Sequence, residues 1–176
     1  MNEAMNVIVE AIWLILPAYI ANSSAVLLGG GKPIDFGKTW RGKPIFGAGK
    51  TWRGFIGGGI CGMAVGIIMN QLWQSFGVGL NAVFVLLSLS FGALAGDLIK
   101  SFFKRRIGKK RGEKWLVIDQ IDFLLGAFFF TFIFNREWFV SNFSLYHIIF
   151  LLIFTPLLHL ATNIIAYVLK LKKVPW

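Results

Sequence analysis

The chain has 176 residues, 56% of them hydrophobic, and its mean hydropathy is +0.69. This composition is typical of an integral membrane protein and excludes a soluble globular domain. The formal net charge is +10. Basic loops this close to a bilayer meet lipid headgroups more often than nucleic acid, so we expect membrane lipids and no nucleic acid as partners.

Five stretches are apolar over the roughly 20 residues that a membrane span needs. They cover residues of about 5–28, 55–76, 80–99, 116–134 and 145–169. We therefore predict an all-α integral membrane protein with five transmembrane helices, in one membrane domain over residues 1–176. The N-terminus lacks the basic leader of a signal peptide, so we expect the first span to be retained.

The basic residues predict the orientation of these spans. Seventeen of the 18 fall on the loops of about 29–54 and 100–115 and on the C-terminal tail, and only Arg136 falls on the other side. The positive-inside rule then places the N-terminus outside and both loops and the C-terminus in the cytoplasm. We expect a multi-pass plasma-membrane protein whose active site, built on these two functional loops, faces the cytoplasm.

Two polar features precede the second span. Asn22 lies near the end of the first span, where it either borders a cavity or bonds to a neighbouring helix. In the first loop, the hexapeptide Gly37–Gly42 recurs as Gly49–Gly54, with the sequence Gly-Lys-Thr-Trp-Arg-Gly in both copies. Glycine N–H groups and basic side chains suit phosphate, although such a loop also suits anionic lipid. A nucleotide-binding P-loop is excluded, because Pro44 stands where that motif needs glycine.

Three carboxylates flank the second loop. Asp97 ends the third span, and Asp119 and Asp122 lie three residues apart at the start of the fourth, on one helix face. Acids at a membrane boundary are costly and usually functional. Carboxylates beside a dense cationic segment suit hard cations and a polyphosphate, although one acid alone could simply pair with a basic residue of the loop.

The order of these residues resembles a known family. Gly96-Asp97-x-x-x-Ser101-x-x-Lys104-Arg105 followed by Asp119-x-x-Asp122 is similar to the pattern of the CTP-dependent phosphatidate cytidylyltransferases, and in particular of their archaeal relatives, the CDP-archaeol synthases. The likeness extends over the whole chain, including Gly29–Asp35 and Gly49–Gly54. Gln120 departs from the bacterial enzymes, which have arginine there, and this favours the archaeal branch.

The resemblance implies transfer of CMP from CTP to an unsaturated archaeal ether-lipid phosphate, giving CDP-archaeol and pyrophosphate. It implies that the three aspartates bind Mg²⁺, and that Lys104 acts with them in catalysis. The residues expected to bind CTP or the lipid phosphate are Asn22, Lys50, Thr51, Arg53, Lys100, Ser101, Arg105 and Arg111. A homodimer is possible, and the sequence does not decide between one metal ion and two.

Three other classes remain as alternatives. A CDP-alcohol phosphotransferase would need Asp-Gly rather than Gly-Asp and a pair of acids four residues apart. A membrane transporter often shows inverted repeats with charges near mid-bilayer. A structural membrane protein could bind anionic lipid through its loops, without nucleotide.

Overall fold

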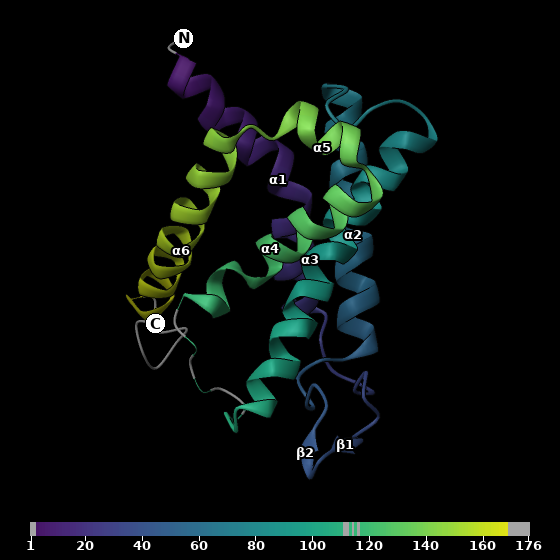
Figure 1. Ribbon diagram of the computed structural model, residues 1–176, viewed down its shortest axis with the longest axis vertical. Coiled ribbons are helices and arrows are strands. Elements are labelled where there is room, and N and C mark those ends of the chain that lie inside the picture. Colours follow the sequence, from purple (N-terminus) through teal and green to yellow (C-terminus); the bar gives the residue numbers. More distant parts are fainter. Residues whose placement is uncertain (1–2, 111–112, 114, 116, 169–176) are drawn as a thin grey trace.

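The computed structural model describes residues 3–110, 113, 115 and 117–168 (Figure 1). Within these residues the regular elements are helices, as predicted, apart from one small β-hairpin. The elements in chain order are α1 (Glu3–Leu27), β1 (Thr39–Trp40), β2 (Lys43–Pro44), α2 (Trp52–Leu72), α3 (Leu80–Arg106), α4 (Ile118–Phe134), α5 (Arg136–Asn142) and α6 (Leu145–Val168).

Several of these helices can cross a membrane. Among the described residues, three are long and apolar enough: Met5–Leu27, Trp52–Leu72 and Leu80–Arg106. The pair formed by α5 and α6, bent by 82°, counts as a fourth if it forms one span. Helix α4 has 17 residues. The chain is therefore a multi-pass membrane protein, while five crossings remain a prediction.

Glycine lets the helices approach closely in two places. On α2, a Cβ added at Gly58 or Gly62 would lie 2.6 Å from a backbone oxygen of α1. These glycines form a small-residue face on α2 that lets the backbone of α1 approach closely. Between α3 and α4, a Cβ at Gly96 would lie 2.3 Å from the backbone oxygen of Asp122. These backbones are in contact, and that contact sets the spacing of the carboxylates.

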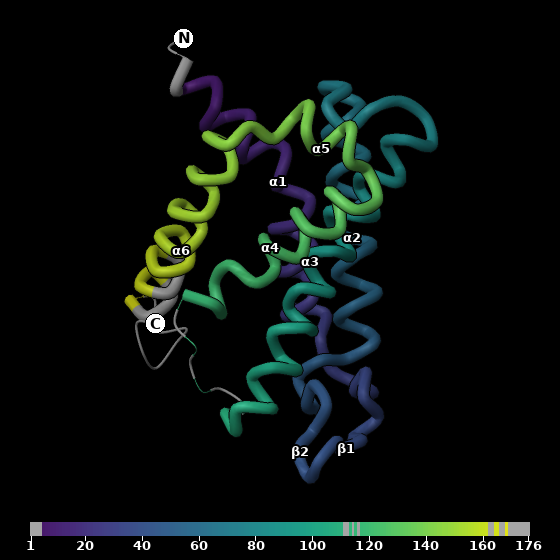
Figure 2. Tube along the Cα trace, in the orientation of Figure 1, coloured from purple at the N-terminus to yellow at the C-terminus, as the bar shows by residue number. Residues whose placement is uncertain are grey.

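The apolar core lies among these close helices. Ile15 of α1, Leu86 and Leu89 of α3 and Phe123 of α4 are almost completely buried in one cluster. Helix α6 packs against this group, and Tyr19 and Thr155 share a hydrogen bond of 2.6 Å between α1 and α6. In Figure 2 the hairpin loop and the end of α3 lie toward one end of the molecule, and α5 lies toward the other.

Helix α3 runs further than the predicted span of 80–99. It continues to Arg106, so the predicted loop of about 100–115 begins too early. Lys and Arg are good helix formers, and a helix C-terminus favours positive charge, so a basic run can stay helical beyond the apolar segment. Lys100, Ser101 and Lys104 are therefore held on a rigid helix rather than on a loop.

The two copies of the repeated hexapeptide adopt different structures. The first forms β1 and the turn of the hairpin, in which Thr39 pairs with Pro44 and Trp40 with Lys43. The second begins α2: Thr51 is the N-cap, and its hydroxyl accepts a hydrogen bond of 3.2 Å from the backbone N–H of Gly54. The backbone conformation of this hexapeptide is therefore determined by its tertiary contacts rather than by an intrinsic preference of its six residues.

Candidate functional site

The three aspartates converge on one ammonium group. Lys100 Nζ lies 3.2 Å from Asp97 Oδ1, 3.2 Å from Asp119 Oδ1 and 2.9 Å from Asp122 Oδ2. Asp97 and Lys100 come from α3, and Asp119 and Asp122 from α4. Because the glycine contact holds the two helices together, one lysine of α3 reaches both acids of α4.

Two further lysines neutralise the same carboxylates. Lys50, from the loop before α2, pairs with Asp97 Oδ2. Lys104 donates to both oxygens of Asp119, at 3.0 and 2.7 Å, and the backbone N–H of Trp115 donates to Asp119 Oδ2 at 2.7 Å. Five of the six carboxylate oxygens therefore contact a lysine ammonium. Three acids and three lysines balance in charge.

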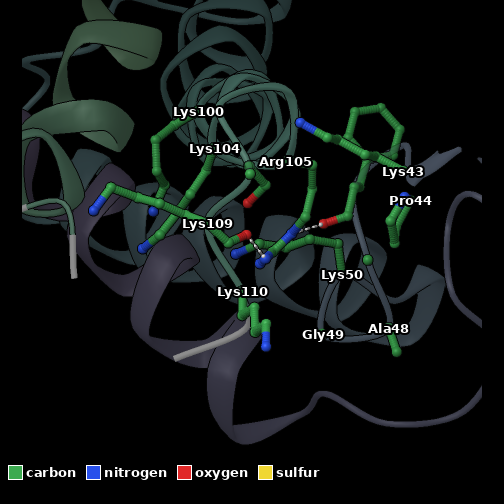
Figure 3. A pocket seen from close by; sticks show the side chains of 14 residues that line it. Lys43, Pro44, Ala48, Gly49, Lys50, Lys100, Lys104, Arg105, Lys109 and Lys110 are labelled. Carbon is green, nitrogen blue, oxygen red and sulfur yellow. Dashed lines mark hydrogen bonds between the residues drawn. The ribbon is translucent and has the colours of Figure 1, made fainter. Parts of the chain in front are cut away.

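A cavity of about 600 Å³, here called the basic cavity, opens beside this cluster (Figure 3). Its wall from α3 carries Lys100, Ser101, Lys104 and Arg105, and the first loop supplies residues on the other side. The other lining residues are Lys43, Pro44, Phe46, Gly47, Ala48, Gly49, Lys50, Gly108, Lys109 and Lys110. Such a concentration of cations beside glycine-rich backbone suits a polyphosphate.

A second cavity of about 660 Å³, here called the acidic cavity, lies among the helices. All three aspartates line it, together with Asn22 and His159. Apolar side chains complete the wall, from α1, α2 and α3: Val26, Phe55, Leu94 and Leu98. This lining suits an amphiphile whose polar group reaches the aspartates while its apolar part lies among the helices.

The two cavities share a boundary. Ala48, Gly49 and Lys50 line both, and Lys50 pairs with Asp97 at the junction. A ligand in the basic cavity and a ligand in the acidic cavity can therefore meet beside the aspartates. The geometry suits transfer of a group between a polyanion and an amphiphile.

Asp35 fixes the loop that carries Lys50. Its carboxylate is buried and accepts hydrogen bonds from the backbone N–H groups of Gly37, Phe46 and Gly47, at 3.0, 2.9 and 2.8 Å. Burial raises the pKa of Asp35, but these N–H groups outweigh it and hold the pKa below its usual range. The charged carboxylate thus sets the path of the chain into the basic cavity.

The structure brings most predicted site residues together. Asn22 and Thr51 line the acidic cavity, Ser101 and Arg105 line the basic cavity, and Lys50 lines both. Thr51 also caps α2, which gives its hydroxyl a structural task. Arg53 is exposed and lines neither cavity, so the structure does not bring it to the site. Arg111 lies outside the described residues.

Several site residues were not singled out from the sequence. Lys43, Lys109 and Lys110 line the basic cavity, although in the sequence they look like ordinary members of charged loops. The sequence presents Asp35 only as part of a motif, because its role depends on backbone N–H groups up to twelve residues away. His159 lines the acidic cavity, but a lone histidine in a span usually bonds to a neighbouring helix.

Comparison with known proteins matches this chain to one family. The family model described as CarS-like, CDP-archaeol synthase, matches residues 4–176. The CDP-archaeol synthase of Methanosarcina acetivorans is 48% identical, covering 92% of this chain and 99% of that protein. The CDP-archaeol synthase of Pyrococcus abyssi is 49% identical, covering 98% of this chain and 100% of that protein.

A solved structure is similar as well. It is described as an intramembrane enzyme for archaeal membrane lipid biosynthesis, and it is 36% identical with a TM-score of 0.74. The match covers 89% of this chain and 94% of that one. Sequence and fold therefore agree over nearly the full length of each protein.

Proposed function

The chain belongs to the family of CarS-like CDP-archaeol synthases, and on this premise we propose how its two cavities carry out the reaction. It is a CTP-dependent cytidylyltransferase of archaeal lipid biosynthesis. The family membership thus favours an enzyme over a transporter or a structural lipid-binding protein. The proposed reaction transfers CMP from CTP to an unsaturated archaeal ether-lipid phosphate. The observation that carries the proposal is the junction of the two cavities at Lys50 and Asp97.

The basic cavity is the proposed site for the triphosphate of CTP. Lys100, Lys104 and Arg105 face it from α3, and Lys50 faces it from the first loop. Phosphoryl and nucleotidyl transfer depend mainly on positioning and on neutralising the charge of the transition state, which this cationic wall supplies. Ser101, only 4% exposed, is placed to donate to a phosphate or to support a neighbouring group.

The acidic cavity is the proposed site for the lipid phosphate, with the tails running between the helices. The phosphate is already ionised, so the reaction needs neither a strong general base nor a covalent nucleophile. One lipid phosphate oxygen attacks the α-phosphorus of CTP and forms a new P–O bond. The bond between the α-phosphorus and the bridging oxygen to the β-phosphate breaks, and pyrophosphate leaves with that electron pair.

The residues present fit Mg²⁺. The donors are carboxylate oxygens from two helices, the hard ligands that this ion prefers, and they already surround a cation, Lys100. Asp122 Oδ2 is buried and has no hydrogen bond of good geometry within the part of the chain that the structure describes. In that same part, no three acidic, histidine or cysteine side chains are already arranged as a metal site. Lys100 would therefore have to withdraw.

We propose that Asp97, Asp119 and Asp122 hold Mg²⁺ when CTP is bound. The ion would neutralise phosphate charge and orient the α-phosphorus for attack. Lys50, Lys100 and Lys104 line the basic cavity as well as contacting the carboxylates. Each can therefore turn from an aspartate to a phosphate oxygen as the charges at the site change.

The proposed setting is the plasma membrane, with five crossings, α4 and α6 among them. The basic loop and the end of α3 would face the cytoplasm, where CTP is available. The N-terminus and α5 would face outward. A homodimer is a further prediction, which the mass of the purified protein–detergent complex would test.

A turnover assay tests the proposed reaction. Purified protein in detergent would receive radiolabelled CTP, Mg²⁺ and either digeranylgeranylglyceryl phosphate or diacyl phosphatidate. We expect a CDP-lipid product with the ether lipid, none after chelation of Mg²⁺, and none from Asp119→Ala. Absence of product with both lipids, together with absence of CTP binding, would rule the proposal out.

A further inference from the structure

The first copy of the repeated hexapeptide has no part in the reaction described above. It forms an exposed hairpin with two-residue strands, β1 and β2. Its central turn residues, Arg41 and Gly42, both have positive φ, at 52° and 73°, as tight hairpin turns require. A two-stranded hairpin is marginal on its own in water, so contacts outside it must hold it in place.

Arg106, in the last turn of α3, supplies those contacts. Its Nη1 donates to the backbone oxygen of Trp40, and its Nη2 donates to the backbone oxygens of Pro44 and, at 3.0 Å, Lys43. Lys43 Nζ donates back to the Arg106 backbone oxygen at 2.9 Å. One guanidinium thus binds three carbonyl groups of the hairpin through two nitrogens fixed in one plane, a geometry that the ammonium of lysine, with all its donors on a single atom, does not reproduce.

Aromatic stacking strengthens the same junction. Trp40 and Phe102 are stacked with ring centroids 5.5 Å apart. The Arg106 guanidinium lies 5.2 Å from the Trp40 ring and 5.1 Å from the Phe102 ring. The tip of the loop is therefore fixed to the end of α3 by hydrogen bonds and by cation–π contacts.

This junction bears on the basic cavity. Lys43 and Pro44, both held by Arg106, line that cavity. The backbone N–H groups of Phe46 and Gly47, which follow shortly after Pro44, donate to the carboxylate of Asp35. The wall of the cavity opposite α3 is thus attached to that helix by Arg106 at the tip and by Arg105, whose Nε donates to the Phe46 backbone oxygen at 3.5 Å, while Asp35 holds its base together. Arg106 itself does not line the cavity.

We propose that Arg106 is a positioning residue for CTP, and that the first hexapeptide copy forms the hairpin through which Arg106 acts. By fixing the hairpin to α3, Arg106 sets the spacing between the two walls of the basic cavity. This inference rests on the proposed assignment of that cavity to the triphosphate. Loss of the fork would leave the reacting groups intact but loosen the binding wall, so the Michaelis constant for CTP should change more than kcat.

Steady-state kinetics with three variants tests this. Arg106→Gln removes charge and fork, and Arg106→Lys keeps the charge without the fork. We expect both to raise KM for CTP about tenfold, equivalent to about 1.4 kcal/mol, with kcat within about threefold. The matched control is Arg41→Gln, because Arg41 lies 5.2 Å from the same Trp40 ring but on the exposed turn. It should leave KM within about twofold.

Hydrogen exchange without substrates provides a readout that does not depend on turnover. The backbone N–H of Ile45 donates to the Lys38 oxygen at 3.2 Å and reports on hairpin closure. Its exchange should be about tenfold faster in both Arg106 variants and unchanged in Arg41→Gln. If the wild-type protein made no CDP-lipid, the proposed function would fail while this exchange experiment still tested the junction.

Three results would overturn the positioning role. One is an unchanged KM in both Arg106 variants. Another is a loss of kcat at constant KM, which would place Arg106 at the reacting groups. The third is full recovery with lysine, which would show that only the charge matters.

Discussion

Lys100 is the residue at which the charges of the site meet. It contacts all three aspartates and also lines the basic cavity, so it faces both the carboxylates and the proposed phosphate site. A buried ion pair is costly to break from one side, because the remaining charge is left uncompensated. The removal of this one ammonium should therefore change metal binding, nucleotide binding and stability together.

We predict that Lys100→Met binds Mn²⁺ at least about tenfold more tightly than the wild type in the absence of CTP. The ammonium no longer competes with the ion for the three carboxylates. Without metal the variant should lose about 3–5 kcal/mol of free energy of unfolding, as expected for a broken buried ion pair, and should unfold at a lower temperature. Mn²⁺ should restore much of this stability. Turnover should fall by at least about tenfold, since one phosphate contact is lost.

Titration calorimetry and thermal unfolding in detergent measure these effects. Lys110→Met is the control, because Lys110 lines the same cavity but is absent from the aspartate contacts. Mn²⁺ affinity that was unchanged or weaker in Lys100→Met would show that the ammonium does not occupy the position of the ion.

Asp35 gives a prediction about pH. Its pKa is held below the usual value of about 4, so the folded state favours the charged form. The stability that this carboxylate contributes is fully present above its unfolded pKa and is lost as pH falls through the lower folded pKa. Asp35→Asn should therefore lower the unfolding temperature at pH 7, with a difference from wild type that shrinks below about pH 4. A difference that grew on acidification would contradict this.

The acids of the site could be predicted from sequence because carboxylates at a membrane boundary are rare and informative. The pairing of Lys50 with Asp97 could not be predicted, because the two residues are 47 positions apart and meet only through the fold. Arg53 shows a different limit of the sequence. Its motif predicts phosphate binding, whereas in the structure Arg53 is exposed and lines neither cavity, and a hexapeptide alone does not reveal which face a helix will expose.

At the scale of elements, the glycines between α3 and α4 determine whether the site forms. Gly96→Ala should reduce stability by about 1–3 kcal/mol, because the new methyl group would lie 2.3 Å from the Asp122 backbone oxygen. The turnover rate of the folded variant should also fall, because Asp97 and Asp122 would move apart. Thermal unfolding and the turnover assay measure the two effects.

Gly57→Ala is the matched helical control. Its Cβ would meet the end of the Leu28 side chain at 2.9 Å, which can move aside. We expect stability and turnover close to wild type. Equal losses in both variants would mean that the α3–α4 contact has no special role in the site.

The helices themselves followed from the apolar runs, but their ends did not. Hydropathy marks the end of the apolar segment near Ile99, whereas the backbone stays helical to Arg106, since basic residues are compatible with helix. The hairpin was also outside what local sequence could predict. Its strands have two residues each, and the contact that holds them comes from Arg106, more than 60 positions later.

At the scale of the whole molecule, the charge asymmetry predicts which end faces the cytoplasm. The hairpin and the end of α3 lie at one end, and α5 lies at the other (Figure 1). In a Cys61→Ala background, Arg41→Cys should be protected from a membrane-impermeant maleimide in intact cells, and Ser141→Cys should react. The reverse labelling pattern would place the proposed active site outside.

The three aspartates, as proposed, hold the metal ion at the point where the two substrates meet. The most direct measurement is the turnover and Mn²⁺ affinity of Asp122→Asn, with Glu137→Gln on α5 as a control far from the site. We predict that turnover falls at least about 100-fold and Mn²⁺ binding weakens, while the control is unaffected. Turnover within about twofold of wild type, with metal binding unchanged, would contradict the claim.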